Sequence, residues 1–130
     1  MDFSWLYKGR SIENSSVWYI GGLMIYEKGA ENRYKSEECY ITDFDGNQHQ
    51  VDPYFIYKST GLFNADGELI WEGDHVHIDY LDFSPEDGDF VIAWDQEKAK
   101  FIASNEIQVI SFDRVFANHS KVVYTAEDYV

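Results

Sequence analysis

Apolar and polar residues alternate one by one over residues 75–80, which read His-Val-His-Ile-Asp-Tyr. Successive side chains of a strand point to opposite faces, so this period of two is typical of a half-buried strand. We therefore predict that Val76, Ile78 and Tyr80 face a core and that His75, His77 and Asp79 face solvent.

Short runs of β-branched and aromatic residues recur along the rest of the chain, and turn signals separate them. Such runs are typical of strands. Asp45-Gly46 predicts a tight turn, because these residues tolerate positive φ. Asp52-Pro53 is expected to end a strand, because proline has no N–H to give to the ladder. The predicted strands are residues 17–26, 39–44, 47–51, 55–57, 69–71, 75–80, 90–94, 99–103 and 122–124.

The stretch from Ile107 to Phe116 fits two alternatives. Ser111 is a residue type that caps helices, so a short helix through Val115 and Phe116 is one of them. Another strand is the second. With either outcome, many short strands and little helix predict a mainly β fold, either a small barrel or a sandwich.

The composition fits one folded domain. Hydrophobic residues make up 45% of the 130 residues and aromatic residues 18%, which is too many for a disordered chain. The single cysteine, Cys39, excludes an intrachain disulfide and favours a reducing compartment. The first residues lack a signal-peptide pattern and no apolar run is long enough to span a membrane, so we expect a cytoplasmic protein.

Negative charge is concentrated in the second half of the chain. The formal net charge is -14, and residues 61–130 hold 15 acids against 4 bases. Residues 66–97 hold 11 acids and neither lysine nor arginine, yet they also carry strand-forming residues, so we expect a folded acidic surface. Surfaces that bind nucleic-acid phosphates use clustered Lys and Arg, so direct contact with nucleic acid is not expected.

A series of short motifs runs through residues 51–76. It reads Val-Asp-Pro at 51–53, Ser-Thr-Gly-Leu at 59–62, Asn-Ala-Asp-Gly-Glu-Leu-Ile at 64–70 and Glu-Gly-Asp-His-Val at 72–76. In this order and spacing the motifs resemble the YopX family of phage and prophage proteins. Trp-Tyr-Ile-Gly-Gly at 18–22 and Gly-Asp-Phe-Val-Ile-Ala-Trp-Asp at 88–95 extend the resemblance over roughly residues 17–104.

The resemblance implies a mainly β protein with an SH3-like barrel around the Glu-Gly-Asp segment, encoded by a phage or a mobile element, and it implies no particular reaction. We expect a single YopX-like β domain over residues 1–130 with little helix. Its N-terminal β-hairpin region covers about 1–58 and its barrel-like part covers about 59–130.

The motif residues are expected to shape turns. Glycine takes positive φ without strain, and short polar side chains bond nearby backbone N–H groups. We assign this structural role to Thr60, Gly61, Leu62, Asp66, Gly67, Glu72, Gly73 and Asp74.

Residues that carry chemistry give weak signals. His75, His77 and Asp79 share one strand face and resemble a metal-ligand set, but a solvated polar face explains them equally simply. Glu72 beside Trp71 is the best candidate for a hydrolytic carboxylate. Cys39 follows Glu37 and Glu38 and has no activating base beside it, which is typical of an inert thiol. We therefore predict no catalytic residue, no cofactor and no metal.

Three functions remain open. The favoured one is a non-enzymatic module that binds a host or phage protein, in which acidic residues steer association and Trp5, Tyr7 or Trp71 anchor the partner. A nucleic-acid mimic that occupies the DNA site of a host enzyme and a small metal-dependent hydrolase are the alternatives. Open strand edges also allow a homo-oligomer. The predicted acidic partner surface consists of Asp79, Asp82, Glu86, Asp87, Asp89, Asp95 and Glu97.

Overall fold

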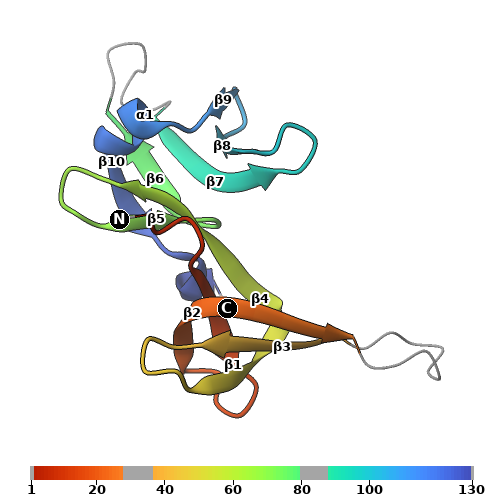
Figure 1. The fold of residues 1–130 in the computed structure, drawn as a ribbon. Coiled ribbons are helices and arrows are strands. Elements are labelled where there is room, and N and C mark those ends of the chain that lie inside the picture. The colour runs from red at the N-terminus through yellow and green to blue at the C-terminus, as the bar shows by residue number, and fades with distance from the viewer. Residues whose placement is uncertain (1, 28–36, 80–87, 130) are drawn as a thin grey trace. The chain divides into compact units, whose positions relative to one another are not determined.

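The computed structural model describes residues 2–27, 37–79 and 88–129 of the chain, which are mainly β (Figure 1). The chain divides into two compact units. The N-terminal unit is Trp5–Lys58, and the C-terminal unit is Ser59–Val130 together with Met1–Ser4. In the described ranges, no helix is long and apolar enough to cross a membrane.

The strands of the N-terminal unit close into a ring. They are β1 (Tyr7–Ser11), β2 (Trp18–Glu27), β3 (Glu37–Thr42) and the first part of β4 (Gln48–Phe63). Each pairs antiparallel with the next, and β4 returns to pair with β1. This closure satisfies the backbone groups that an open sheet leaves unpaired at its edges.

Strand β2 pairs with two neighbours in succession, and the change from one to the other falls at its paired glycines. Its first part up to Gly21 pairs with β1, and its second part from Gly22 pairs with β3. A Cβ atom on Gly21 would lie 1.8 Å from the carbonyl oxygen of Thr42. Only glycine allows this close approach of two backbones, so Gly21 and Gly22 mark the point inside one strand where the pairing partner changes.

The prediction that Asp52-Pro53 ends a strand was wrong, because β4 continues through it. The ladder with β1 does shift in register here, between the pairs Gly9–Ile56 and Ser11–Val51. Proline is tolerated at such a bulge, because the bulge requires no N–H from it. The missing donor therefore disturbs the ladder locally without ending the strand.

The core of the ring is small. Cys39, Ile41 and Val51 are almost fully buried, and Tyr7, Tyr19, Leu23 and Ile56 pack around them. Cys39 is a free thiol inside this core, with 2% of its surface exposed.

The C-terminal unit contains a hairpin and an open sheet. The end of β4, from Ser59, pairs with β5 (Leu69–Trp71). The sheet has the order β10-β6-β7-β8-β9, all antiparallel. Its strands are β6 (His75–Ile78), β7 (Asp89–Asp95), β8 (Lys100–Ser104), β9 (Val109–Ser111) and β10 (Ser120–Tyr124).

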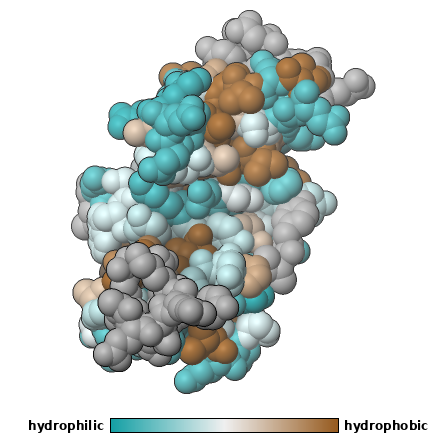
Figure 2. Space-filling view, turned by 90° about the vertical axis from the view of Figure 1, so that its right-hand side faces the viewer, coloured by the Kyte–Doolittle hydropathy of each residue, from teal (hydrophilic) through white to brown (hydrophobic). Residues whose placement is uncertain are grey.

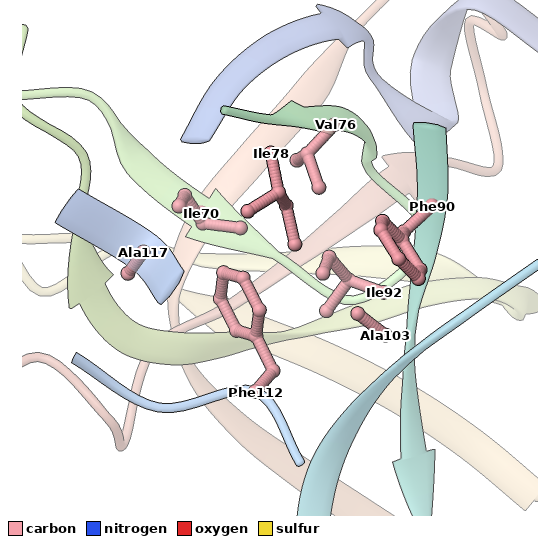
Figure 3. Packing of buried hydrophobic residues seen from close by; sticks show 8 residues of the cluster. All are labelled: Ile70, Val76, Ile78, Phe90, Ile92, Ala103, Phe112 and Ala117. Atoms are coloured by element: carbon pink, nitrogen blue, oxygen red, sulfur yellow. The ribbon is translucent and has the colours of Figure 1, made fainter. Parts of the chain in front are cut away.

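One hydrophobic cluster holds the C-terminal unit together, and Figure 3 shows its side chains pointing toward one another from the sheet, β5 and the helix. Val76 and Ile78 are each 1% exposed, which confirms the alternation predicted for β6. Tyr80 lies outside the described residues. The cluster consists of Ile70, Val76, Ile78, Phe90, Ile92, Ala103, Phe112 and Ala117.

Both alternatives for the stretch from Ile107 to Phe116 are realised in succession. Strand β9 comes first, and helix α1 (Arg114–Asn118) follows. The N-cap is Asp113, whose side chain accepts the N–H of Phe116 at 3.0 Å, and not the predicted Ser111. A second short helix, the 3-10 turn η1, spans Ala126–Tyr129.

The closed ring of strands occurs in the N-terminal unit, where we expected a hairpin region. In the C-terminal unit, the described strands form the open sheet and the β4–β5 hairpin. An SH3-like barrel over residues 59–130 stays a prediction.

Candidate functional site

Thr60, Gly61 and Leu62 stabilise the hairpin of β4 and β5. The Thr60 hydroxyl donates to the carbonyl oxygen of Ile70 at 2.6 Å and accepts the N–H of Leu62 at 3.1 Å. Gly61 has φ +73, which glycine adopts without strain. These contacts confirm that Thr60 bonds nearby backbone groups and that Gly61 takes positive φ.

The next turn is stabilised by Asn64 and not by Asp66. The Asn64 carboxamide oxygen accepts the N–H groups of Asp66 and Glu68 at 3.1 and 2.9 Å. Asn64 is 5% exposed, whereas Asp66 is exposed. Gly67 takes the expected positive φ of +80.

The segment from Glu72 to Asp74 attaches the turn after β5 to strand β7. Asp74 is 1% exposed, and its Oδ2 accepts the N–H of Trp71 at 2.8 Å. The N–H of Gly73 donates to the carbonyl of Ile92, and the N–H of Ile92 donates to the carbonyl of Asp74. Gly73 has φ +87, and Glu72 is partly buried in the same turn.

The three polar residues of the β6 face do not converge on one point. His77 Nδ1 lies 2.8 Å from Asp89 Oδ1, while the His75 ring packs edge-on against Tyr124. Asp79 is exposed at the end of β6. Within the parts of the chain that the structure describes, no three His, Cys, Asp or Glu side chains are placed to hold a metal ion.

The described acids of the predicted partner surface fall into two groups. Asp79 and Asp89 lie at one end of the β6–β7 pair, and Asp95 and Glu97 lie at the far end of β7, where Asp95 accepts backbone N–H groups of the turn. Asp95 follows Asp89 by six positions along the strand, which corresponds to roughly 20 Å. Asp82, Glu86 and Asp87 lie outside the described residues.

Of the three aromatic anchors considered, one is exposed. Trp5 has 52% of its surface exposed, whereas Trp71 is 8% exposed in the core of the C-terminal unit. Tyr7 packs on the core of the ring.

Trp5 belongs to an apolar surface that no sequence pattern predicted. Tyr19 and Leu23 pack on the ring core, so their neighbours Ile20 and Met24 turn to the opposite face, and near the end of β2 Ile25 is exposed as well. Those residues are largely apolar, and Ile20, Met24 and Tyr26 are each more than 40% exposed. We call this surface the β2 face and define it as Trp5, Ile20, Met24, Tyr26, Tyr40 and Phe44.

Neighbouring members of the β2 face contact one another. Phe44 packs edge-on against Trp5, whose ring lies 3.9 Å from the position of a Cβ on Gly22. Tyr26 packs edge-on against Tyr40, and its hydroxyl lies 2.7 Å from the sulfur of Met24. The signal in the sequence was a run that is apolar at both odd and even positions from Val17 to Tyr26, which a half-buried strand does not require.

The C-terminal sheet carries a cavity of about 270 Å³ on the side opposite its core. It lies over the cross-strand neighbours His75, Val91 and Ser104, which alternate with buried core residues. Asp89, Glu106, Val123 and Tyr124 line it as well.

A histidine–carboxylate pair holds the turn between β3 and β4 in the ring. His49 Nε2 lies 2.8 Å from Asp43 Oδ2, and the His49 ring stacks on Tyr19 with centroids 3.7 Å apart. Asp43 Oδ1 accepts the N–H groups of Asp45 and Asn47. The hydrogen bond from His49, followed by that from Asn47, lowers the pKa of the Asp43 carboxyl.

No protein-family model matches the chain, and no curated protein sequence matches it.

Proposed function

We propose that this protein is a non-enzymatic binding module that docks a partner protein on the β2 face. The observation that carries the proposal is the exposure of five apolar or aromatic side chains of the β2 face, which are all its members except the partly buried Tyr40. Contiguous exposed apolar surface is typical of protein interaction sites. The resemblance to the YopX family adds a phage or prophage origin to this proposal, and cytoplasmic location remains part of it.

The composition of the β2 face also favours a protein partner. Aromatic residues and methionine are enriched in interface cores, because they bury a large area with few rotatable bonds. Figure 2 shows hydrophobic residues gathered in patches between hydrophilic ones on the side of the molecule that faces the viewer. On the β2 face itself, Trp5 and Phe44 offer the widest exposed rings, with 52% and 70% of their surfaces exposed.

Protein docking accounts for these features better than nucleic-acid mimicry. A mimic of DNA needs carboxylates spaced continuously like phosphates, whereas apolar Val91 and Ala93 separate the acids at the two ends of β7. The two functions also differ in salt dependence. The affinity of a contact through apolar surface changes little with salt, whereas the affinity of a contact through carboxylates falls steeply as the salt concentration rises.

Site-specific photo-crosslinking in a cell lysate, at low and at high salt, tests the proposal. The full chain carries benzoylphenylalanine in place of Phe44, which belongs to the β2 face, or in place of Tyr54, which is 89% exposed on β4. Strand β4 does not pair with β2, so Tyr54 is the matched aromatic control. We expect a reproducible cross-linked product from position 44 and none from position 54.

A second substitution, Met24→Glu, places a charge on the β2 face and is expected to reduce the product from position 44 at least tenfold, in low and in high salt. Equal products from positions 44 and 54 would contradict the proposal, as would a product that consists of two copies of this chain. Loss of the product at high salt would favour mimicry instead.

A further inference from the structure

The cavity of the C-terminal sheet is separate from the β2 face and has its own chemistry. Its floor is formed where β6, β7 and β8 pair, and the apolar side chains Val91 and Val123 contribute to its lining. Asn105 and Glu106 belong to the turn between β8 and β9, and Tyr124 belongs to β10. The lining therefore comes from four strands and one turn of a single unit.

Two carboxylates and no lysine or arginine line the cavity. Glu106 is exposed and makes neither a hydrogen bond nor an ion pair with any described residue. Asp89 is oriented by His77, and the Asn105 side chain donates to the Asp89 carbonyl at 3.2 Å. The C-terminal unit as a whole has 16 acids against 4 bases, a net charge of -12. The potential in and around this cavity is therefore negative and favours a cation.

Aromatic rings form one side of the cavity. Tyr124 is 51% exposed, and its ring meets the His75 ring at 85° with centroids 6.4 Å apart. A guanidinium group stacks on such a ring and binds carboxylates through its fork of N–H donors. The methylene stem of an arginine side chain packs against apolar groups, and Val91 and Val123 offer such groups in this cavity.

The volume limits what the cavity holds. About 270 Å³ lies below the range of about 300–1,000 Å³ that is typical for pockets of drug-sized ligands. The cavity therefore suits one side chain of a larger molecule better than a nucleotide or an organic cofactor.

We propose that the cavity lined by Glu106, Asp89 and Tyr124 binds an arginine side chain of a partner protein. The carboxylates pair with the guanidinium, Tyr124 stacks against it, and Val91 and Val123 contact its stem. This contact is a second recognition site, on the unit that does not carry the β2 face.

Titration of the full chain with a capped peptide Gly-Ser-Arg-Ser-Gly, followed by two-dimensional ¹H–¹⁵N NMR, tests the proposal. We expect saturable shifts in the amides of the cavity lining, weak in absolute affinity because both carboxylates are exposed. The same peptide with citrulline in place of arginine keeps the shape and loses the charge, so we expect its affinity to be at least tenfold lower.

Variants assign the binding to the cavity. Glu106→Gln and Tyr124→Leu are each expected to lower the affinity for the arginine peptide at least threefold. Tyr124→Phe keeps the ring, so we expect it to bind the peptide with the affinity of the wild type. Asp66→Asn removes an exposed carboxylate of the same unit outside the cavity, and we expect an affinity within twofold of the wild type.

Three results would overturn the proposal. They are the absence of saturable shifts, equal binding of the citrulline peptide, and equal effects of Glu106→Gln and Asp66→Asn. None of them bears on the cross-link from the β2 face, so this inference and the proposed function fail independently.

Discussion

At the scale of single residues, Gly21 has the least room for a side chain among the described glycines of the ring. A methyl group there would overlap the carbonyl oxygen of Thr42 on the neighbouring strand. We expect Gly21→Ala to lower the free energy of unfolding by about 3 kcal/mol or more, because backbone atoms and not a flexible side chain must move. Chemical denaturation measures this loss.

Gly22 provides the matched control for that prediction. A Cβ atom on Gly22 would meet only the Trp5 ring, at an ordinary contact distance of 3.9 Å. Gly22→Ala should therefore change the stability by less than about 1 kcal/mol. Equal losses for the two variants would show that the close approach at Gly21 does not limit the fold.

Asn64 and Asp66 give a second prediction at this scale. The Asn64 side chain accepts two backbone N–H groups, whereas Asp66 contributes only its own N–H to the turn. Asn64→Ala leaves those donors without their acceptor, so we expect it to cost about 1–3 kcal/mol of unfolding free energy. Asp66→Ala should cost less than about 0.5 kcal/mol. Thermal or urea unfolding of both variants separates the two roles, and the reverse order would contradict the assignment.

At the scale of elements, the turn between β3 and β4 should make the stability of the ring depend on pH in the acidic range. The lowered pKa of Asp43 means that its ionised form is stabilised in the folded state. That contribution is fully present above the unfolded pKa of about 3.9 and is lost as the pH falls through the lower folded value. We expect Asp43→Asn to lower the free energy of unfolding at neutral pH. Below about pH 4, the free energies of unfolding of the variant and of the wild type should become more similar.

Urea unfolding of both proteins at several pH values measures this difference. Asp45→Asn, an exposed position in the same turn, controls for the change of one charge. A difference between Asp43→Asn and wild type that stays constant down to about pH 2 would show that the carboxylate contacts do not act in the folded state.

The strands differ in how well their positions could be predicted from the sequence. The alternation in β6 and the hairpin of β7 and β8 were predicted correctly, because each pattern is local and its apolar face meets one core. The strand β1 was missed, since Tyr7–Ser11 is short and polar and its Lys8 is 3% exposed. Its strand character depends on pairing with both β2 and β4, which no local pattern encodes.

The candidate surfaces were harder to predict than the strands. The β2 face was not found, because apolar residues on an outward face look the same in a sequence as those of a fully buried strand. Only the closure of the ring decides that Tyr19 and Leu23 turn inward and Met24 turns outward. The cavity likewise combines Glu106 and Tyr124 from distant segments, which antiparallel pairing brings to one sheet.

At the scale of the whole molecule, the two units differ strongly in charge. The C-terminal unit has a net charge of -12, and the N-terminal unit has 8 acids against 6 bases, a net charge of -2. Like charges on a compact unit repel one another, and salt screens this repulsion. Salt should therefore stabilise the C-terminal unit more than the ring.

Native-state hydrogen exchange reads out the two units separately. The amides of Ile92 and Ala103 report on the C-terminal sheet, and that of Ile41 reports on the ring. Between about 0.01 M and 0.15 M salt the Debye length falls from about 30 to about 8 Å. Over this range we expect slower exchange at Ile92 and Ala103 and little change at Ile41. Equal slowing at all three positions would contradict a charge effect confined to one unit.

Strand β4 has a consequence for how such a protein changes over generations. The boundary between Lys58 and Ser59 lies inside one continuous strand, with no spacer whose length is free to vary. Insertion of a single residue there would turn the following side chains, including Thr60, to the opposite face of the hairpin. Recombination at this junction therefore preserves both units only when each side chain of β4 keeps its face of the strand. The two units are for this reason inherited most readily as a pair.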